Sequence, residues 1–260
     1  NRNCAYGYLF ETPILHADQV MRKYTQAPHP FVFEPAPTKP GKAHVAEQDT
    51  SDLTVILLGS SHIYLPYVIL ALDELGKMGL GRDNVPFQIE HVSADNGSIL
   101  FDAASSSILS QPSPSECCLA PGTSRIGPFT IHLISPLRLQ HEGSLSFAPD
   151  LFSIVAALRR RLFLLRYFHD GGHTAQLASD FLDAARGVKT TSSQFLWNDA
   201  IRSSTRQKRE VPIGGLTGFL SCHGDIGLLE PLLRAGEIVH IGKNATFGLG
   251  QFRLTIGDLP

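Results

Sequence analysis

The order of strand and helix patterns in the second half of the sequence limits the possible folds most strongly. Four stretches with the apolar periodicity of strands are expected at residues 128–134, 193–197, 213–222 and 251–255. A helical stripe lies between the first two of them, at Leu151, Val155, Leu158, Leu162 and Leu165. A short helix is expected from Pro231, because proline suits the first turn of a helix. This β-α-β-β-α-β order is typical of a ferredoxin-like unit.

A partial copy of the same order precedes this unit. Residues 31–33 and 52–59 have strand character, a helix is expected from about Tyr64, and residues 87–92 show a further strand pattern. Residues 104–127 are rich in Ser, Pro and Gly, which indicates a linker. We therefore expect an α+β protein with two tandem ferredoxin-like (RRM-like) domains. They are an N-terminal domain at 1–103, incomplete at its N-terminus, and a C-terminal domain at 128–260.

Three glycines surround a lysine just before the last expected strand. Glycine permits positive φ and close approach of the backbone to a ligand, and consecutive amides beside a lysine suit phosphate oxygens. The alternative is a turn that needs glycine only for its shape. The residues expected to bind a phosphate backbone are Gly242, Lys243, Asn244, Thr246, Gly248 and Gly250.

Composition bounds the class of protein. The 260 residues are 43% hydrophobic, enough for one or two cores, and the formal net charge is −2. Charge is unevenly distributed, since residues 151–260 carry 13 Lys and Arg against 9 Asp and Glu. A basic half is compatible with a local phosphate-binding surface. No apolar stretch reaches membrane-spanning length, so we expect no membrane segment. The four cysteines form neither a zinc spacing nor a disulfide framework, so we expect a cytoplasmic protein that holds no metal or cofactor.

Several segments, in order along the chain, resemble the CRISPR precursor-RNA processing endoribonucleases of the RAMP superfamily. The resemblance covers nearly the whole chain and includes the glycine run before the last strand. Its segments are Phe10-Glu11-Thr12-Pro13, Pro28-His29-Pro30-Phe31, Tyr64-Leu65-Pro66-Tyr67, Ser135-Pro136-Leu137-Arg138, Gly214-Gly215-Leu216-Thr217-Gly218 and His240 to Phe252.

The sequence departs from the family at its start. Members usually open with a strand and a glycine/arginine-rich helix before the Phe-Glu-Thr-Pro segment, and the sequence lacks both. We therefore expect it to be a fragment. In several relatives the catalytic residue lies near that first helix.

The resemblance implies metal-independent RNA cleavage, in which the 2′-hydroxyl beside the scissile phosphate attacks and leaves a 2′,3′-cyclic phosphate. Such a reaction needs a base, an acid and a cation, and histidine suits the first two roles. Among eleven histidines, His29 and His240 lie in family-like segments and His62 precedes a helix. We expect the acid or base among these three; each is alternatively an ordinary structural histidine.

A basic connection lies between the second and third strands of the C-terminal unit. As a hairpin loop it is suited to lie along an RNA backbone, although a solvated loop is the plain alternative. Its four cations, with no acid among them, are Arg202, Arg206, Lys208 and Arg209.

The function expected from these features is cleavage of CRISPR repeat RNA with retention of the product, the crRNA, and entry into a CRISPR effector complex. A second possibility is a non-catalytic RAMP subunit that binds crRNA within such a complex. A third is a ferredoxin-like domain pair that binds another anionic ligand. The fold does not distinguish among the three.

Overall fold

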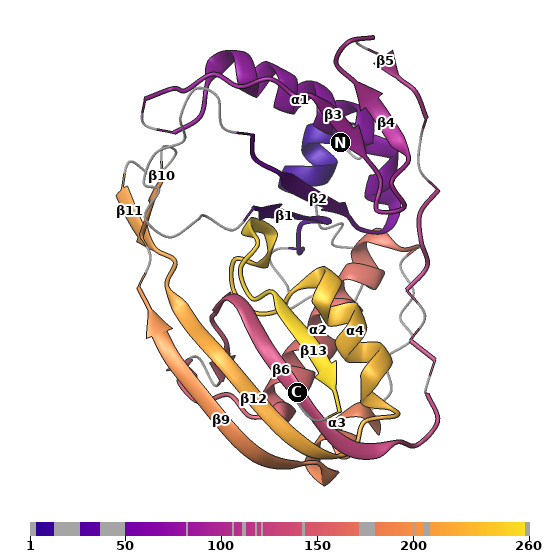
Figure 1. The fold of residues 1–260 in the computed structure, drawn as a ribbon, viewed down its shortest axis with the longest axis vertical. Coiled ribbons are helices and arrows are strands. Elements are labelled where there is room, and N and C mark those ends of the chain that lie inside the picture. The colour runs from indigo at the N-terminus through magenta and orange to yellow at the C-terminus, as the bar shows by residue number, and fades with distance from the viewer. Residues whose placement is uncertain are drawn as a thin grey trace.

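The computed structural model describes residues 4–12, 27–36, 50–81, 83–105, 107–110, 113–117, 119–120, 122–141, 144–171, 180–199, 201–204 and 209–257 of the 260-residue chain. Its C-terminal half contains a four-stranded antiparallel sheet (Figure 1). The strands are β6 (Ile126–Leu137), β9 (Lys189–Asn198), β12 (Gly215–Asp225) and β13 (Phe252–Ile256). Their order in the sheet is β13-β6-β12-β9, so the first and third strands of the unit lie in the centre.

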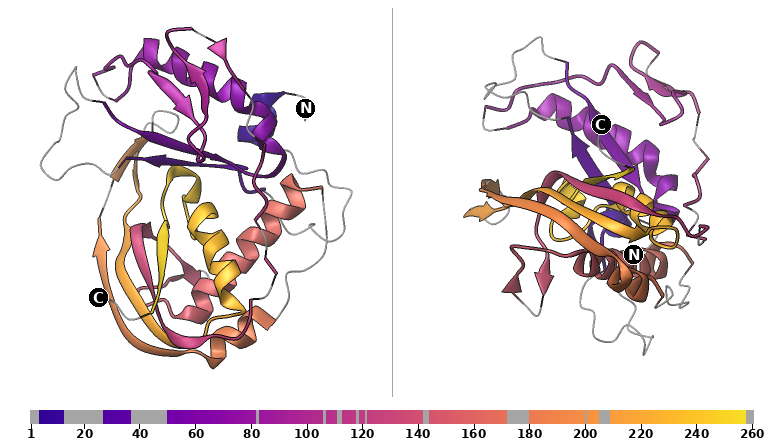
Figure 2. Two further views of the ribbon diagram at one scale, coloured as in Figure 1. Left: turned by 45° about the vertical axis from the view of Figure 1, so that its right-hand side comes forward. Right: turned by 60° about the horizontal axis from the view of Figure 1, so that its bottom comes forward.

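Helices cover one face of this sheet (Figures 1 and 2). They are α2 (Leu151–His169), α3 (Asp180–Gly187) and α4 (Leu229–Val239). Helix α2 begins where the Asp150 carboxylate accepts a hydrogen bond from the Ser153 amide at 2.8 Å, which satisfies a free amide of the first turn. Sequence periodicity predicted α2 and α4 but not the short helix α3, whose Phe181 and Ala185 are buried.

The core lies between the sheet and these helices. Along β6, Phe129, Ile131 and Leu133 point inward and are buried, because alternate residues of a strand face opposite sides. They meet the buried stripe of α2, including Leu158, and the buried Leu232 of α4. Burial of each such side chain stabilises the fold by roughly 1.5–3 kcal/mol. The α+β class and the ferredoxin-like order are thus confirmed for the C-terminal half.

The N-terminal half is smaller and contains two sheets. A two-stranded antiparallel sheet pairs β1 (Phe31–Pro35) with β2 (Leu53–Leu57). The π-helix η1 (Gly7–Glu11) precedes these strands, and the 3-10 helix η3 (Gly59–Tyr64) and helix α1 (Leu65–Met78) follow them. The other sheet joins β3 (His91–Ser93), β4 (Ile99–Asp102) and β5 (Ser107–Ile108).

Two details of the N-terminal half differ from the sequence prediction. The expected strand over 87–92 is replaced by the short strand β3, because the Phe87 amide donates to the Gly76 carbonyl at 3.1 Å and holds this segment against the end of α1. Strand β5 lies inside the segment expected to be a linker and pairs with β4. Ordered structure of the N-terminal half therefore extends past residue 103.

Two hairpins and one short helix complete the described elements. Strands β7 (Gln140–His141) and β8 (Ser144–Leu145) form one hairpin, and β10 (Ile201–Ser204) and β11 (Arg209–Pro212) form the other. The 3-10 helix η4 (Ala245–Phe247) lies between α4 and β13. No helix among the described residues has the length and apolar character needed to cross a membrane.

Short helices mediate the main contacts between the two halves in the described part of the chain. Helix η4 packs against β1, and α2 packs against η3.

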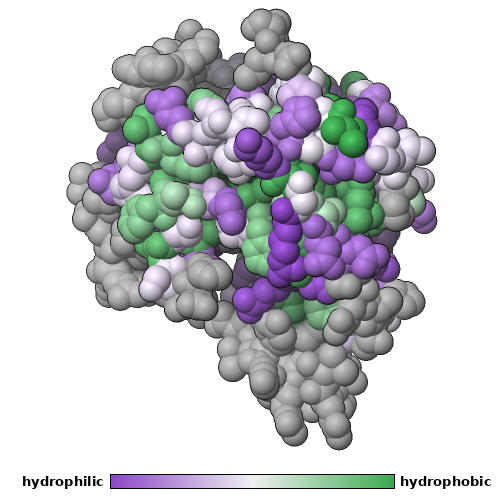
Figure 3. Space-filling view, turned by 90° about the horizontal axis from the view of Figure 1, so that it is seen from below, coloured by the Kyte–Doolittle hydropathy of each residue, from purple (hydrophilic) through white to green (hydrophobic). Residues whose placement is uncertain are grey.

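At the opposite end of the C-terminal half, hydrophilic and hydrophobic residues are interspersed on the described surface (Figure 3). The interface between the halves is the region in which the histidines of interest come together.

Candidate RNA-processing site

The segment 242–250, here called the glycine-rich loop, packs against the N-terminal half. Gly248 has φ +80°, and a Cβ there would lie 2.6 Å from the Phe33 carbonyl oxygen of β1. Gly250 has φ +69°, and a Cβ there would lie 1.8 Å from the Ile241 carbonyl oxygen. Both positions therefore need glycine for conformation and for space.

Four amides of the glycine-rich loop are engaged within the protein. Lys243 N donates to Arg138 O at 3.0 Å, Phe247 N to Asn244 O at 2.9 Å, Gly248 N to Ala245 O at 3.0 Å, and Gly250 N to Pro136 O at 3.0 Å. The expected row of exposed amides is therefore not formed at these positions, because the loop uses them to hold its own shape. The Lys243 side chain is exposed, whereas Asn244 and Thr246 are half-buried.

His240, expected to act as an acid or base, is buried. Its side chain has no exposed surface, and its Nε2 lies 2.7 Å from Oε1 of Glu34 on β1. Burial lowers the pKa of His240, opposed by the Glu34 carboxylate and the Leu249 backbone. In this position the ring connects the two halves of the protein and does not face solvent.

Arg161 of helix α2 supports the same interface. The Arg161 Nε donates to the Val239 carbonyl at 2.7 Å, at the C-terminal end of α4, where a cation is favoured. Burial lowers the pKa of Arg161 to about 10, and its charge contributes to lowering the pKa of His240. Arg161 thus holds the end of the helix that leads into the glycine-rich loop.

A second cluster joins η1, η3 and the end of α2. His169 is buried, and its Nε2 lies 2.7 Å from the Pro28 carbonyl, so this nitrogen carries a proton and donates. In the neutral ring, Nδ1 then accepts from the Tyr8 hydroxyl at 3.2 Å. The Tyr8 ring also packs on Tyr64, with 5.2 Å between centroids. Tyr8 and His169 could not be paired from the sequence, because no motif relates residues 161 positions apart.

His29 adjoins this cluster through Pro28. Its ring is half-buried and stacks on Phe31 at 5.8 Å, and its Nδ1 is buried without a hydrogen-bond partner among the described residues. Burial lowers the pKa of His29, opposed by the Leu9 backbone and the charge of Glu11. A depressed pKa keeps the ring neutral near pH 7, the form required of a base.

His62 lies in η3, which packs on the end of α2. Its Nδ1 lies 2.9 Å from the Gly59 carbonyl, so Nδ1 donates and the lone pair of the neutral ring is on Nε2. The Gly59 backbone also lies against His169, since a Cβ at Gly59 would be 2.3 Å from the His169 carbonyl oxygen. The structure therefore brings His62, His29, Tyr8 and His169 to one interface and places His240 at the other contact, against β1.

The basic connection forms the expected hairpin. Arg202 lies in β10 and Arg209 in β11, and the two strands are antiparallel. The hairpin extends from the sheet toward the level of the N-terminal half (Figure 1). Arg206 and Lys208 lie outside the described residues. Within the described part of the chain, no three His, Cys, Asp or Glu side chains are grouped as metal ligands.

Comparison with solved structures relates the fold to Cas6. The chain matches a Cas6 (TTHB231) product complex with a TM-score of 0.58 at 16% identity, covering 96% of this chain and 92% of the other. It matches a Cas6 (TTHA0078) product complex with a TM-score of 0.56 at 16% identity, covering 96% and 91%. A partial Cas6-RT-Cas1–Cas2 complex gives a TM-score of 0.55 at 14% identity, covering 87% of this chain and 39% of the other.

Family models match both halves of the sequence. A model described as an N-terminal domain matches residues 1–113, and the model of the CRISPR-associated endoribonuclease Cas6 matches residues 131–252. A search of curated proteins finds no match. The Cas6 match spans the central strands, α4 and the glycine-rich loop, and agrees with the fold. Residues 131–252 thus match the CRISPR-associated endoribonuclease Cas6 family, and the chain shares its fold with solved Cas6 structures.

Proposed function

We propose that this protein binds CRISPR repeat RNA and cleaves it by attack of the 2′-hydroxyl on the neighbouring phosphate, without a metal ion. The observation that carries the proposal is the Cas6 endoribonuclease match over residues 131–252. The η3–α2 contact supports it, since His62 lies in η3 and the Tyr8–His169 hydrogen bond lies at the end of α2, and RNA transesterification needs groups that exchange protons near neutral pH.

His62 is the base that we propose. Its Nδ1–H is held by the Gly59 carbonyl, so Nε2 has the free lone pair and accepts the 2′-hydroxyl proton. The 2′-oxygen then bonds to phosphorus while the bond from phosphorus to the 5′-oxygen breaks. The products are a 2′,3′-cyclic phosphate and a 5′-hydroxyl, whose proton comes from a general acid. His29 is the second candidate for proton transfer, and His240 is a positioning residue for the glycine-rich loop.

Two substrate changes test this mechanism. A single 2′-deoxy nucleotide just before the cut removes only the attacking oxygen, so we expect binding to persist and cleavage to stop. Excess EDTA is expected to leave the rate unchanged. If EDTA stops cleavage and the deoxy substrate is still cut, the mechanism is wrong.

We propose that the exposed Lys243 and the cations of the β10–β11 hairpin bind the RNA backbone and retain the product. The remaining loop positions, Gly242, Asn244, Thr246, Gly248 and Gly250, hold Lys243 in place. Replacing Arg206 and Arg209 by alanine is expected to lower the slope of log binding constant against log salt by roughly 0.7–0.9 per lost contact. An unchanged slope would place the RNA elsewhere. Because one similar chain belongs to a Cas6-RT-Cas1–Cas2 complex, other CRISPR proteins are proposed partners.

A non-catalytic crRNA-binding subunit is the second candidate. The observation in its favour is that His240 is fully buried and His29 has one buried, unpaired ring nitrogen. The two functions differ in one result: a subunit of this kind binds repeat RNA and leaves it uncut over many hours, whereas an endoribonuclease cuts it in a single turnover.

A further inference from the structure

The sheet of the C-terminal half has one face that no described helix covers (Figure 2). Residues on this face, here called the open face, are those that alternate with the buried core positions of each strand. Strand pairing aligns them in rows across the sheet. One row runs from Arg253 on β13 through His132 on β6 and Phe219 on β12 to Gln194 on β9. The side chains of Arg253 and Gln194 are exposed, and those of His132 and Phe219 are half-buried.

Two ring side chains lie side by side at the centre of the open face. His132 and Phe219 are direct partners in the β6–β12 pair, and their ring centroids are 6.3 Å apart with an interplanar angle of 41°. Four-stranded sheets with aromatic side chains on the central strands bind single-stranded RNA by stacking bases on those rings. The first and third strands of this unit, β6 and β12, occupy the two central positions that such binding requires.

The charge of the open face is complementary to RNA. Arg253 is exposed and its guanidinium makes no ion pair or hydrogen bond with any described residue. Lys189 and His223, a further register pair, are also exposed. Asp225, at the end of β12, is the acidic residue of this strand on the open face. Its carboxylate accepts hydrogen bonds from the Ser124 hydroxyl and from the amides of Arg125 and Gly227.

The neighbouring row supplies hydroxyl groups. It consists of Thr255, Thr130, Ser221 and Ser192, aligned across the four strands. The Thr130 and Ser221 hydroxyls are hydrogen-bonded to each other at 2.9 Å. Thr130 is buried, whereas Ser192 is exposed and Ser221 and Thr255 are half-buried. Hydroxyls both donate and accept, so those of Ser192, Ser221 and Thr255 are suited to base edges and to ribose 2′-hydroxyls.

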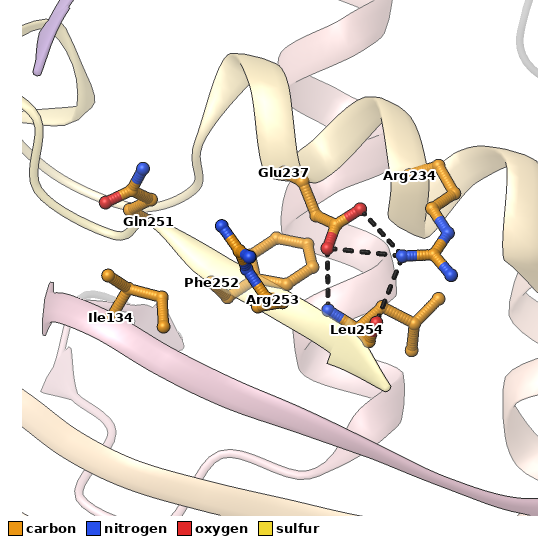
Figure 4. Close-up of a pocket in the computed structure, with 7 residues that line it drawn as sticks. All are labelled: Ile134, Arg234, Glu237, Gln251, Phe252, Arg253 and Leu254. Atoms are coloured by element: carbon orange, nitrogen blue, oxygen red, sulfur yellow. Dashed lines mark hydrogen bonds and ion pairs between the residues drawn. The ribbon is translucent and has the colours of Figure 1, made fainter. Parts of the chain in front are cut away.

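The edge of the sheet favours RNA over an added protein strand. A groove lined by Ile134, Arg253, Gln251, Glu237 and Arg234 follows strand β13 (Figure 4). In this groove the Leu254 amide donates to Glu237 Oε1 at 2.7 Å, and its carbonyl accepts from Arg234 at 3.0 Å. Glu237 and Arg234 thus form hydrogen bonds with the outward-facing amide and carbonyl of Leu254, which an added strand would need for pairing.

We propose that the open face binds single-stranded RNA, with bases stacked on Phe219 and His132 and the backbone contacted by Arg253. The RNA identity rests on the proposed function, but the site is separate from the histidine cluster at the interface. It would hold a single-stranded segment that flanks the cleaved bond. Duplex RNA does not fit the proposal, because its bases are already stacked and paired.

The test is fluorescence anisotropy with a labelled oligouridylate of about ten nucleotides, a length within the range of single-strand sites. The parent is expected to bind it, and an RNA duplex of the same length is expected not to compete. Phe219→Ala is expected to weaken binding roughly 5- to 150-fold, the range for loss of one stacked base. Phe219→Tyr, which retains a ring, is expected to bind like the parent.

Arg253→Ala and a matched aromatic control complete the design. Arg253 is exposed, so Arg253→Ala leaves the core intact. This variant is expected to lower the slope of log binding constant against log salt by about 0.7. Phe147→Ala removes an exposed aromatic that packs on Trp197 rather than on the open face, so binding is expected to be unchanged. Circular dichroism verifies that each variant is folded.

Three outcomes overturn the proposal: no binding by the parent, competition by the duplex as strong as by the single strand, or a folded Phe219→Ala and Arg253→Ala pair that binds like the parent. These outcomes are distinct from failure of the proposed function. If the parent protein cleaves repeat RNA but does not bind oligouridylate, only the proposed open-face site is contradicted. If it binds oligouridylate through the Phe219 ring but does not cut repeat RNA, only the proposed endoribonuclease function is contradicted.

Discussion

His240 and Glu34 are 206 residues apart in sequence, and the Nε2 of the first lies 2.7 Å from Oε1 of the second. The pair joins the start of the glycine-rich loop to strand β1 and therefore connects the two halves of the protein. Because a carboxylate only accepts, Nε2–H is the donor in this bond. We therefore propose that His240, which the sequence suggested as an acid or base, positions the glycine-rich loop.

Removal of the Glu34 carboxylate is expected to destabilise the protein. Glu34→Ala leaves the buried His240 Nε2–H without an acceptor, which costs roughly 1–3 kcal/mol of unfolding free energy. Glu34→Gln retains an amide oxygen and is expected to lose less. Urea denaturation measures both, with the exposed Glu90→Gln as control, expected to lie within about 0.5 kcal/mol of the parent. Equal loss in the alanine and glutamine variants would contradict a role for the hydrogen bond.

The same histidines are expected to make stability depend on pH. Burial lowers the pKa of His240 and of His29 below the ordinary value of 6.5. The unfolded chain therefore binds more protons than the folded protein below that pH. The free energy of unfolding is expected to have its full value above about pH 6.5 and to fall as the pH decreases below it. The measurement is urea denaturation on both sides of this pH. The double variant His29→Gln, His240→Gln is expected to show a smaller pH dependence, and an identical dependence would contradict the assignment.

Gly248 and Gly97 provide a matched test of the packing of the loop. Their φ angles are +80° and +81°, but a Cβ at Gly248 would meet the Phe33 carbonyl at 2.6 Å, whereas nothing lies within 4 Å of one at Gly97. Gly97→Ala is expected to cost about 1–2 kcal/mol, from the left-handed backbone alone. Gly248→Ala is expected to cost more, because the loop must also move away from β1. Thermal denaturation compares them; equal losses would show that the loop accommodates a methyl group without moving.

His62→Ala is expected to slow single-turnover cleavage of repeat RNA by roughly 10²–10⁴-fold, the contribution of a general base. Ile63→Ala, an exposed neighbour in the same short helix, is the control and is expected to cut at the parental rate. His29→Ala is expected to slow cleavage if its ring supplies the second proton transfer. Parental rates in both histidine variants would remove the interface cluster from the catalytic role.

Much of the C-terminal fold could be predicted because its signals are local. The 4-3-4-3 stripe of α2 and the alternation in β6 and β12 each depend on residues close together in sequence, and the structure confirms these elements. The N-terminal half was predicted less well. Strand β3 is short because residues 76 and 87 bond to each other, a contact that periodicity does not reveal.

The candidate site shows the limit of sequence reasoning more clearly. Glycines at 248 and 250 were recognised, but a phosphate-binding role was inferred from amides that instead bond to Asn244, Ala245 and Pro136, among others. The number of glycines is a property of the sequence. Which carbonyl each amide meets depends on the path of distant segments.

The sequence by itself indicated the order of the four C-terminal strands with helices α2 and α4, and the glycines at 248 and 250 where the backbone takes positive φ, because these signals depend on neighbours along the chain. Only the tertiary structure decided which histidines face solvent. His240 is enclosed by a strand more than two hundred residues earlier in the chain, and Tyr8 meets His169 across 161 positions. Burial and proton exchange depend on such encounters, since desolvation and hydrogen bonding are set by what packs around a side chain and not by its neighbours in sequence.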